Sequence, residues 1–198
     1  MPRIKALAET DLPQAAQTFH GMRQVYGFVP ASILTMHRQP GLAEAVGALF
    51  QAAVSESELL PLDLKWLVAH AASRGAACTY CQADTASNAA HTGLDPRKLD
   101  AVWEFETSPV YSGAERSALR VAFASGMVPN AVDDDMFDDL ARHFTEEEIL
   151  ELVGVLSVFG FLNRWNSTLQ TELDAVPLAF AADHLVAQGW KAGEHAPS

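Results

Sequence analysis

The chain has 198 residues, of which 49% are hydrophobic, 19% are charged and two are cysteines. A chain of this length can bury a core without cross-links, and so few cysteines exclude a disulfide-built secreted scaffold. The formal net charge of -12 argues against binding to nucleic acid or to an anionic membrane surface. We recognise no signal peptide and no membrane-spanning segment, and we expect a cytoplasmic protein with reduced cysteines.

Helix signals are frequent in the first half of the chain, and strand signals are scarce. Apolar residues at three- and four-residue spacing follow the four prolines near which we expect helices to begin: Pro13, Pro30, Pro40 and Pro61. The first of these helices should end before Gly27, and Gly75 should interrupt the last one.

The second half carries clearer signals for helix starts. Asp95, directly before Pro96, is expected to be the N-cap of a helix. The three aspartates at 133–135 are expected to mark the start of another helix. Two pairs have the spacing of a capping box: Ser112 with Glu115, and Thr145 with Glu148.

Two apolar helices are expected near the C-terminus. The longest helix, at roughly 145–173, is apolar on nearly every side and should be buried in the core or between subunits. A shorter helix is expected from Pro177 to Trp190, and its apolar residues need a surface to cover, either on this chain or on a partner.

The chemistry of the sequence is concentrated in Cys78-Thr79-Tyr80-Cys81. Two cysteines three residues apart lie on neighbouring turns of one helix face, and a helix that begins near Cys78 would favour its thiolate. A thiolate of this kind can be oxidised to a sulfenic acid, with which the second thiol condenses to form a disulfide. The spacing therefore predicts a redox-active dithiol.

Three other interpretations of the pair stay open. A thioredoxin-type motif would require flanking strands, which we do not find. A zinc site would require two more ligands, and the spacing of His70 and His91 fits no zinc-finger pattern, so no metal is expected. The third interpretation is that both cysteines serve only in packing.

The features around the cysteines follow a distinctive order: Leu60-Pro61, the helix from Leu64 to Ala72, the CxxC motif, then Ala89, Ala90 and Gly93. In this order they resemble the alkylhydroperoxidase D (AhpD) and carboxymuconolactone decarboxylase family. Three flanking segments resemble its peroxidase-related branch: Gly27 to Pro30, Ser112 to Arg116, and Asn163 to Asn166. The resemblance covers about residues 20–174.

The resemblance implies an all-α fold, an AhpD-like helical bundle that forms a homo-oligomer such as a dimer, trimer or hexamer. We therefore expect one domain over residues 1–198, with a core at 20–174 and a C-terminal helical tail at 175–198. The implied activity is that of a thiol-dependent peroxidase or disulfide oxidoreductase. It would take a small hydroperoxide or disulfide as substrate and a thiol as electron donor, with no cofactor.

The resemblance and the local sequence favour different cysteines as the first nucleophile. In the peroxidase branch the second cysteine attacks and the first resolves, which implies Cys81 as peroxidatic and Cys78 as resolving. A helix start near Cys78 instead favours Cys78 as the more acidic thiol.

The sequence departs from the family at the positions of its proton relay. Twelve residues before the first cysteine, the family's glutamate is replaced by Trp66, which cannot carry protons. Three and four residues after the second cysteine, where the family has a histidine, stand Asp84 and Thr85. Asp84 should raise the pKa of a neighbouring cysteine unless it is protonated or paired, and Thr85 could donate a hydrogen bond to a thiolate.

Two histidines could stand in for the missing relay. His70 lies one turn after Trp66 and could point at the cysteines, or it could pack in a core or an interface. His91 lies seven residues after Asp84 and could approach it, or it could sit at the end of the helix. The candidate catalytic residues are therefore Cys81, Cys78, His70, Asp84, Thr85 and His91.

Two hypotheses from different functional classes follow. The first is the thiol-dependent enzyme. The second is a family member that has lost the relay and serves as a redox-responsive or ligand-binding oligomer. A lactone decarboxylase is less favoured, because that branch does not rely on the cysteine pair and an acidic surface suits an anionic substrate poorly.

Overall fold

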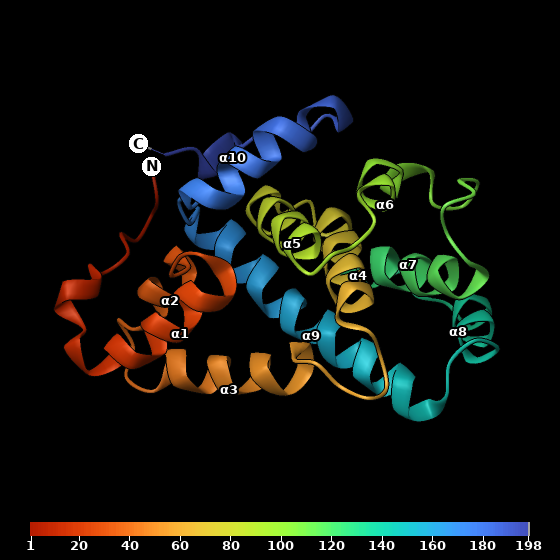
Figure 1. Ribbon diagram of the computed structural model, residues 1–198, viewed down its shortest axis with the longest axis horizontal. Helices are drawn as coiled ribbons and strands as arrows, with labels where there is room; N and C mark the ends of the chain where they lie inside the picture. Colours follow the sequence, from red (N-terminus) through yellow and green to blue (C-terminus); the bar gives the residue numbers. More distant parts are fainter. Residues whose placement is uncertain (198) are drawn as a thin grey trace.

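The computed structural model describes residues 1–197, which form α-helices joined by turns and short 3-10 segments, with no strand in this range (Figure 1). The helices are α1 (Ala16–Tyr26), α2 (Ala31–Met36), α3 (Leu42–Val54), α4 (Leu62–Gly75), α5 (Thr79–His91), α6 (Pro96–Asp100), α7 (Gly113–Gly126), α8 (Asp134–Ala141), α9 (Glu146–Leu169) and α10 (Ala175–His184). The expected all-α fold is confirmed.

The predicted helix starts are confirmed at their caps. Both capping boxes form, one at the start of α7 and one at the start of α9. Asp95 caps α6 and Asp133 caps α8 through their side chains. These local hydrogen bonds satisfy backbone N–H groups that have no partner within the helix.

The central helix of the fold is α4, whose residues are all buried from Leu64 to Arg74. It contacts α5, α7 and α9. Its crossing with α7 is so close that a Cβ atom added to Gly126 would lie 2.1 Å from the carbonyl oxygen of Ala72. A Cβ atom added to Gly75 would lie 2.1 Å from the carbonyl oxygen of Phe123. Two glycines therefore set the distance between the two helices.

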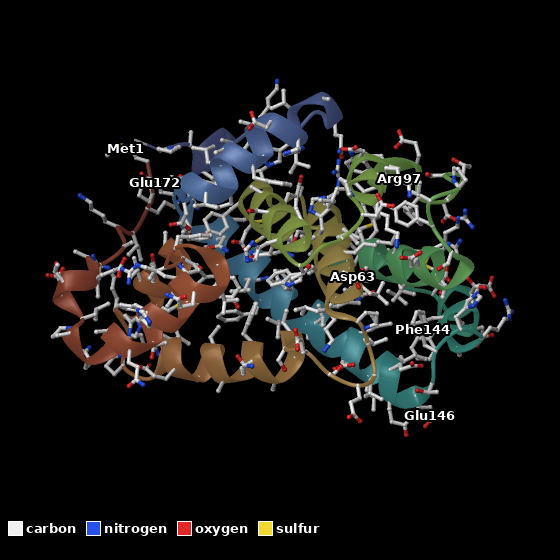
Figure 2. All side chains as sticks on the ribbon, viewed as in Figure 1. Met1, Asp63, Arg97, Phe144, Glu146 and Glu172 are labelled. Carbon is white, nitrogen blue, oxygen red and sulfur yellow. The ribbon has the colours of Figure 1, made fainter. Side chains whose placement is uncertain are left out.

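The long helix α9 crosses the molecule diagonally, with Glu146 at its start and Glu172 just beyond its end in Figure 2. It ends at Leu169 and not at residue 173 as predicted, because Gln170 adopts a left-handed conformation with φ 51°. The helix is buried on one side only. On the other side, three apolar residues are 71%, 40% and 38% exposed: Leu150, Val153 and Phe161. Burial within the protomer thus accounts for only part of its apolar surface.

The C-terminal tail covers α5 with its own apolar residues. Helix α10 packs against α5 (Figure 1), and Leu185 is fully buried. Trp190 is also buried, and its indole Nε1 donates to the carbonyl oxygen of Thr79 at 2.9 Å. The surface that the tail needs is therefore found on this chain. In residues 1–197, no helix is long and apolar enough to cross a membrane.

The glycine crossing leads to a prediction about stability. We expect Gly126→Ala to lower the free energy of unfolding by about 1–3 kcal/mol, because the new methyl group meets the backbone of α4 and the helices must separate. Chemical denaturation measures the change. As a control, Gly21→Ala adds a methyl group in α1 where nothing lies within 4 Å. The control should leave the free energy unchanged or raise it by up to about 1 kcal/mol. Equal effects of the two substitutions would contradict the close approach.

Candidate functional site

The cysteine motif begins in the short turn between α4 and α5, at the residue that caps α5. Ala77 adopts a left-handed conformation with φ 54°, and its N–H donates to the carbonyl oxygen of Arg74 at 3.0 Å. The N–H of Cys78 donates to the carbonyl oxygen of Ser73 at 3.1 Å. This pair of bonds is the Schellman arrangement that ends a helix. Cys78 is at the same time the N-cap of α5, which confirms the expected helix start.

The sulfur of Cys78 lies among hydrogen-bond donors at this helix start. Its Sγ accepts from the backbone N–H of Cys81 at 3.4 Å. The side chain of Cys81 lowers the pKa of Cys78 most, and Ser167 and the backbone N–H groups of Cys81 and Tyr80 lower it further, against the opposing effect of burial. These donors stabilise the negative charge of a thiolate.

Cys81 has the opposite character, although it lies on the next turn. Burial raises its pKa well above the ordinary value, and the neighbouring Cys78 raises it further. One contact acts the other way, since Asn166 Nδ2 donates to Cys81 Sγ at 3.4 Å. Both cysteines are free, and they are 0% and 2% exposed. Of the two thiols, Cys78 is therefore the one whose surroundings favour the thiolate.

Asp84 lies one turn after Cys81 on the same helix. Burial raises the pKa of Asp84 to about 7, and the negative charges of Asp174 and Cys78 contribute, while a hydrogen bond with Asn88 opposes the shift. The sequence predicts that Asp84 disfavours a nearby thiolate unless it is protonated. With a pKa of about 7, a large fraction of the carboxyl is protonated at neutral pH, so it can coexist with the Cys78 thiolate and can donate a proton.

His70 and Thr85 hold α5 against α4. His70 Nδ1 lies 3.1 Å from both the carbonyl oxygen of Gln82 and Thr85 Oγ1. Because a carbonyl oxygen can only accept, Nδ1 carries the proton, and Nε2 accepts from Arg74 Nη1 at 3.4 Å. Burial lowers the pKa of His70 to about 3, so the ring is neutral. The hydroxyl of Thr85 donates to the carbonyl oxygen of Cys81 at 2.6 Å, which is a backbone contact and not a thiolate contact.

Trp66 and His91 lie at the edges of the site. Trp66, where the family has its glutamate, is buried and packs against Phe50 and Phe159, with ring centroids 6.0 and 5.9 Å away. His91 is the last residue of α5, which is the second of the two places predicted for it. It stands seven residues from Asp84, about 10 Å along the helix axis.

A cavity of about 680 Å³ opens beside Asp84. Its walls come mainly from α1, α2 and α3, and Asp84 and Asn88 line it from α5, the helix that carries Cys81. Six of its larger lining side chains are aromatic or apolar: Met22, Val25, Tyr26, Ile33, Phe50 and Leu162. A cavity of this size with an apolar wall and a few polar groups is typical of a small-molecule site. Across residues 1–197, no group of three or more His, Cys, Asp or Glu side chains is placed to hold a metal ion.

The structure brings further polar side chains to the candidate site that the sequence does not single out. Tyr80 lies inside the CxxC motif, and its hydroxyl donates to Asp174 Oδ2 at 2.9 Å. Asn166 lies in a flanking segment of the family resemblance and contacts a cysteine sulfur. Tyr26 faces Asp84, and burial raises its pKa to about 12. Tyr80 could have been noticed as the residue between the two cysteines, but the sequence holds no local signal for Asp174 or Tyr26.

The part of the chain that contains the two cysteines is similar to known proteins. The model of the carboxymuconolactone decarboxylase family matches residues 40–124. The uncharacterized protein YnjA of Escherichia coli strain K12 is 31% identical over 116 residues, a match that covers 58% of this chain and 64% of YnjA.

Solved structures extend the similarity to most of the chain. The debrominase Bmp8 is 38% identical with a TM-score of 0.83, covering 91% of this chain and 96% of Bmp8. A cysteine-to-alanine variant of Bmp8, solved in complex with 2,3,4-tribromopyrrole, matches equally well. A peroxidase-related protein with an AhpD core from Ralstonia eutropha JMP134 is 20% identical, with a TM-score of 0.77 and coverage of 91% and 95%, and shows the fold alone. From these matches and the order of its motifs, the chain belongs to the AhpD-like carboxymuconolactone decarboxylase family.

Proposed function

We propose that this protein is a dithiol oxidoreductase, in which Cys78 and Cys81 together donate two electrons to a small apolar electrophile in the main cavity. The observation that carries the proposal is the position of Cys78 as the N-cap of α5, with its sulfur 3.4 Å from the backbone nitrogen of Cys81. A helix start favours the thiolate, and the three-residue spacing lets the second thiol reach it.

The order of the two sulfurs follows from their acidity. Cys78 carries the thiolate and makes the first bond, and Cys81 then condenses with the oxidised sulfur to form the disulfide. This order is the reverse of the one that the family resemblance implies. An external thiol returns the pair to its reduced form.

The cavity favours an aromatic substrate over a very small oxidant. Tyr26, Phe50 and Trp66 present aromatic surface to it, whereas hydrogen peroxide would need no such space. The 38% identity with a debrominase supports a brominated aromatic compound as the substrate class. An organic hydroperoxide is the second candidate, because the same dithiol can reduce an O–O bond.

Reduction of an aryl bromide by this pair balances in electrons and protons. The Cys78 thiolate attacks the bromine, and the electron pair of the C–Br bond goes to carbon, which takes a proton from Asp84. Cys81 then displaces bromide from the sulfur of Cys78 and gives its thiol proton to the Asp84 carboxylate, so the products are the reduced aromatic compound, bromide and a disulfide. With a hydroperoxide, the same two thiols yield an alcohol, water and a disulfide.

A stoichiometric assay tests the proposed function. Reduced protein is mixed with one equivalent of 2,3,4-tribromopyrrole or, separately, of cumene hydroperoxide, and free thiols are counted together with released bromide or alcohol. We expect two thiols to be lost for each bromide released, and no turnover with a dithiol reductant in either Cys78→Ser or Cys81→Ser. If thiols were lost with the hydroperoxide but not with the bromopyrrole, a brominated substrate would be rejected and the dithiol chemistry would stand. Thiols that react with neither compound would reject the proposed function.

The order of attack is tested by alkylating single-cysteine variants with iodoacetamide at a series of pH values. Cys81→Ser leaves Cys78 with a hydroxyl that can still donate to its sulfur, and the midpoint should lie below the ordinary value of about 8.5. In Cys78→Ser the midpoint of Cys81 should lie above it, because burial disfavours that thiolate. Restricted access slows both reactions without moving their midpoints. If Cys81 showed the lower midpoint, the order implied by the family resemblance would hold instead.

A further inference from the structure

The last turn of α9 supplies a polar contact to each sulfur of the dithiol. Asn166 Nδ2 donates to Cys81 Sγ at 3.4 Å, and the side chain of the next residue, Ser167, hydrogen-bonds with Cys78. Apart from Asn163, the other buried residues of α9 are all apolar. The polar residues of this helix are therefore placed where it meets the cysteines.

Asn166 is held in place by both its side chain and its backbone. The residue is 1% exposed, so its amide is enclosed by the protein. Its carbonyl oxygen accepts the N–H groups of Gln170 and Thr171 at the left-handed turn that ends α9. The donor that meets the Cys81 sulfur is thus fixed before any reaction takes place, and a fixed donor needs no rearrangement when charge develops next to it.

The sulfur of Cys81 acts as the acceptor in its contact with Asn166. The side chains of Cys78 and Cys81 hydrogen-bond with each other, and this bond lowers the pKa of Cys78 and raises the pKa of Cys81. Cys81 is therefore the donor to Cys78. Because a thiol has a single proton to donate, the same sulfur can only accept from the amide.

Packing does not explain an amide at position 166. The Oδ1 atom of Asn166 is buried and has no hydrogen-bond partner within residues 1–197. A buried acceptor without a partner costs free energy, which an apolar side chain of similar size would avoid. The contact that distinguishes Asn166 from such a side chain is the one that its Nδ2 makes with Cys81.

The second thiol step of the proposed reaction is the one that burial opposes. Cys81 has to lose its proton and gain negative charge on sulfur as it attacks the oxidised Cys78. Burial raises the pKa of Cys81 well above the ordinary value, and within residues 1–197 the group that acts in the opposite direction is Asn166. A donor aimed at the atom where negative charge develops lowers the barrier of such a step.

We propose that Asn166 is a catalytic residue of the resolving step, in which its amide stabilises the negative charge that develops on the Cys81 sulfur. The inference rests on the proposed function, because it concerns the second of the two thiol steps. In that step the S–H bond of Cys81 breaks and an S–S bond to Cys78 forms. The group bound to Cys78 leaves with the electron pair of its bond to sulfur.

The two thiol steps can be separated with 2,2′-dipyridyl disulfide, which requires neither halide nor peroxide chemistry. Cys78 displaces one pyridine-2-thiolate and forms a mixed disulfide. Cys81 then displaces the second pyridine-2-thiolate, which takes up the proton that Cys81 loses, and the protein disulfide closes. Absorbance of the released thione, together with acid quenching and mass spectrometry of the protein, gives a rate constant for each step.

Asn166→Leu removes the donor and keeps a side chain of similar size. We expect the second rate constant to fall by about 10-fold or more, because a hydrogen bond to a charged group is lost, while the first stays unchanged. The mixed disulfide of Cys78 should then accumulate. Asn163→Leu is the matched control: it makes the same exchange one turn earlier, at an amide without a hydrogen-bond partner in residues 1–197, and should change neither rate constant.

Two further measurements keep the test independent of a packing change in Asn166→Leu. Asn166→Asp has the size of the original side chain, and at alkaline pH its carboxylate cannot donate, so the second step should be slow there too. In the Cys78→Ser background, iodoacetamide alkylation of Cys81 is titrated with and without Asn166→Leu. We expect loss of the amide to raise the midpoint by about one pH unit.

Several results would overturn the role of Asn166. One is a second rate constant that does not change in Asn166→Leu, or that falls equally in Asn163→Leu. Another is a fall in the first rate constant alone, because Cys81 would then be the sulfur that attacks first. An unchanged alkylation midpoint of Cys81 would also overturn it. None of these results depends on turnover of the bromopyrrole or of a hydroperoxide, so a failure of the proposed function in the stoichiometric assay stays distinguishable.

Discussion

The proposed chemistry depends on a single residue that lies between two helices and helps to define the end of one and the start of the other. Cys78 ends α4 by donating its N–H to the carbonyl oxygen of Ser73, and it begins α5 by accepting the N–H of Cys81 on its sulfur. Because α4 is buried along almost its whole length, the start of α5 cannot move independently of the core. The environment that favours a thiolate is thus a property of the packed fold and not of a flexible loop.

Burial also limits how much negative charge the site can hold. A thiolate at Cys78 makes a second thiolate at Cys81 and an ionised Asp84 costly, since little solvent reaches them. The consequence is a division among chemically similar acids: the pKa of one sulfur is lowered, the pKa of the other is raised, and the pKa of the carboxyl is about 7. The missing glutamate and histidine of the family therefore do not leave the site without a proton donor.

Local features of the structure could be predicted from the sequence, and long-range ones could not. Helix starts that are marked by a proline, by a capping pair or by Cys78 depend on residues only a few positions apart. They lie where the sequence predicts them. The end of α9 differs from the predicted one because the left-handed turn falls on Gln170, and glutamine is not a residue type that indicates such a turn. The contacts of Tyr80 with Asp174 and of Asn166 with Cys81 join segments more than 80 residues apart, so no spacing rule could reveal them.

The main cavity and the dithiol are built from separate parts of the chain. Most of the cavity wall comes from α1, α2 and α3, whereas the sulfurs and their donors come from α5 and the end of α9. Residues in the first three helices can change in size or polarity without touching the groups that set the acidity of Cys78. On the proposed function, such changes would alter which molecules fit the cavity while the electron-donating cysteines stay the same.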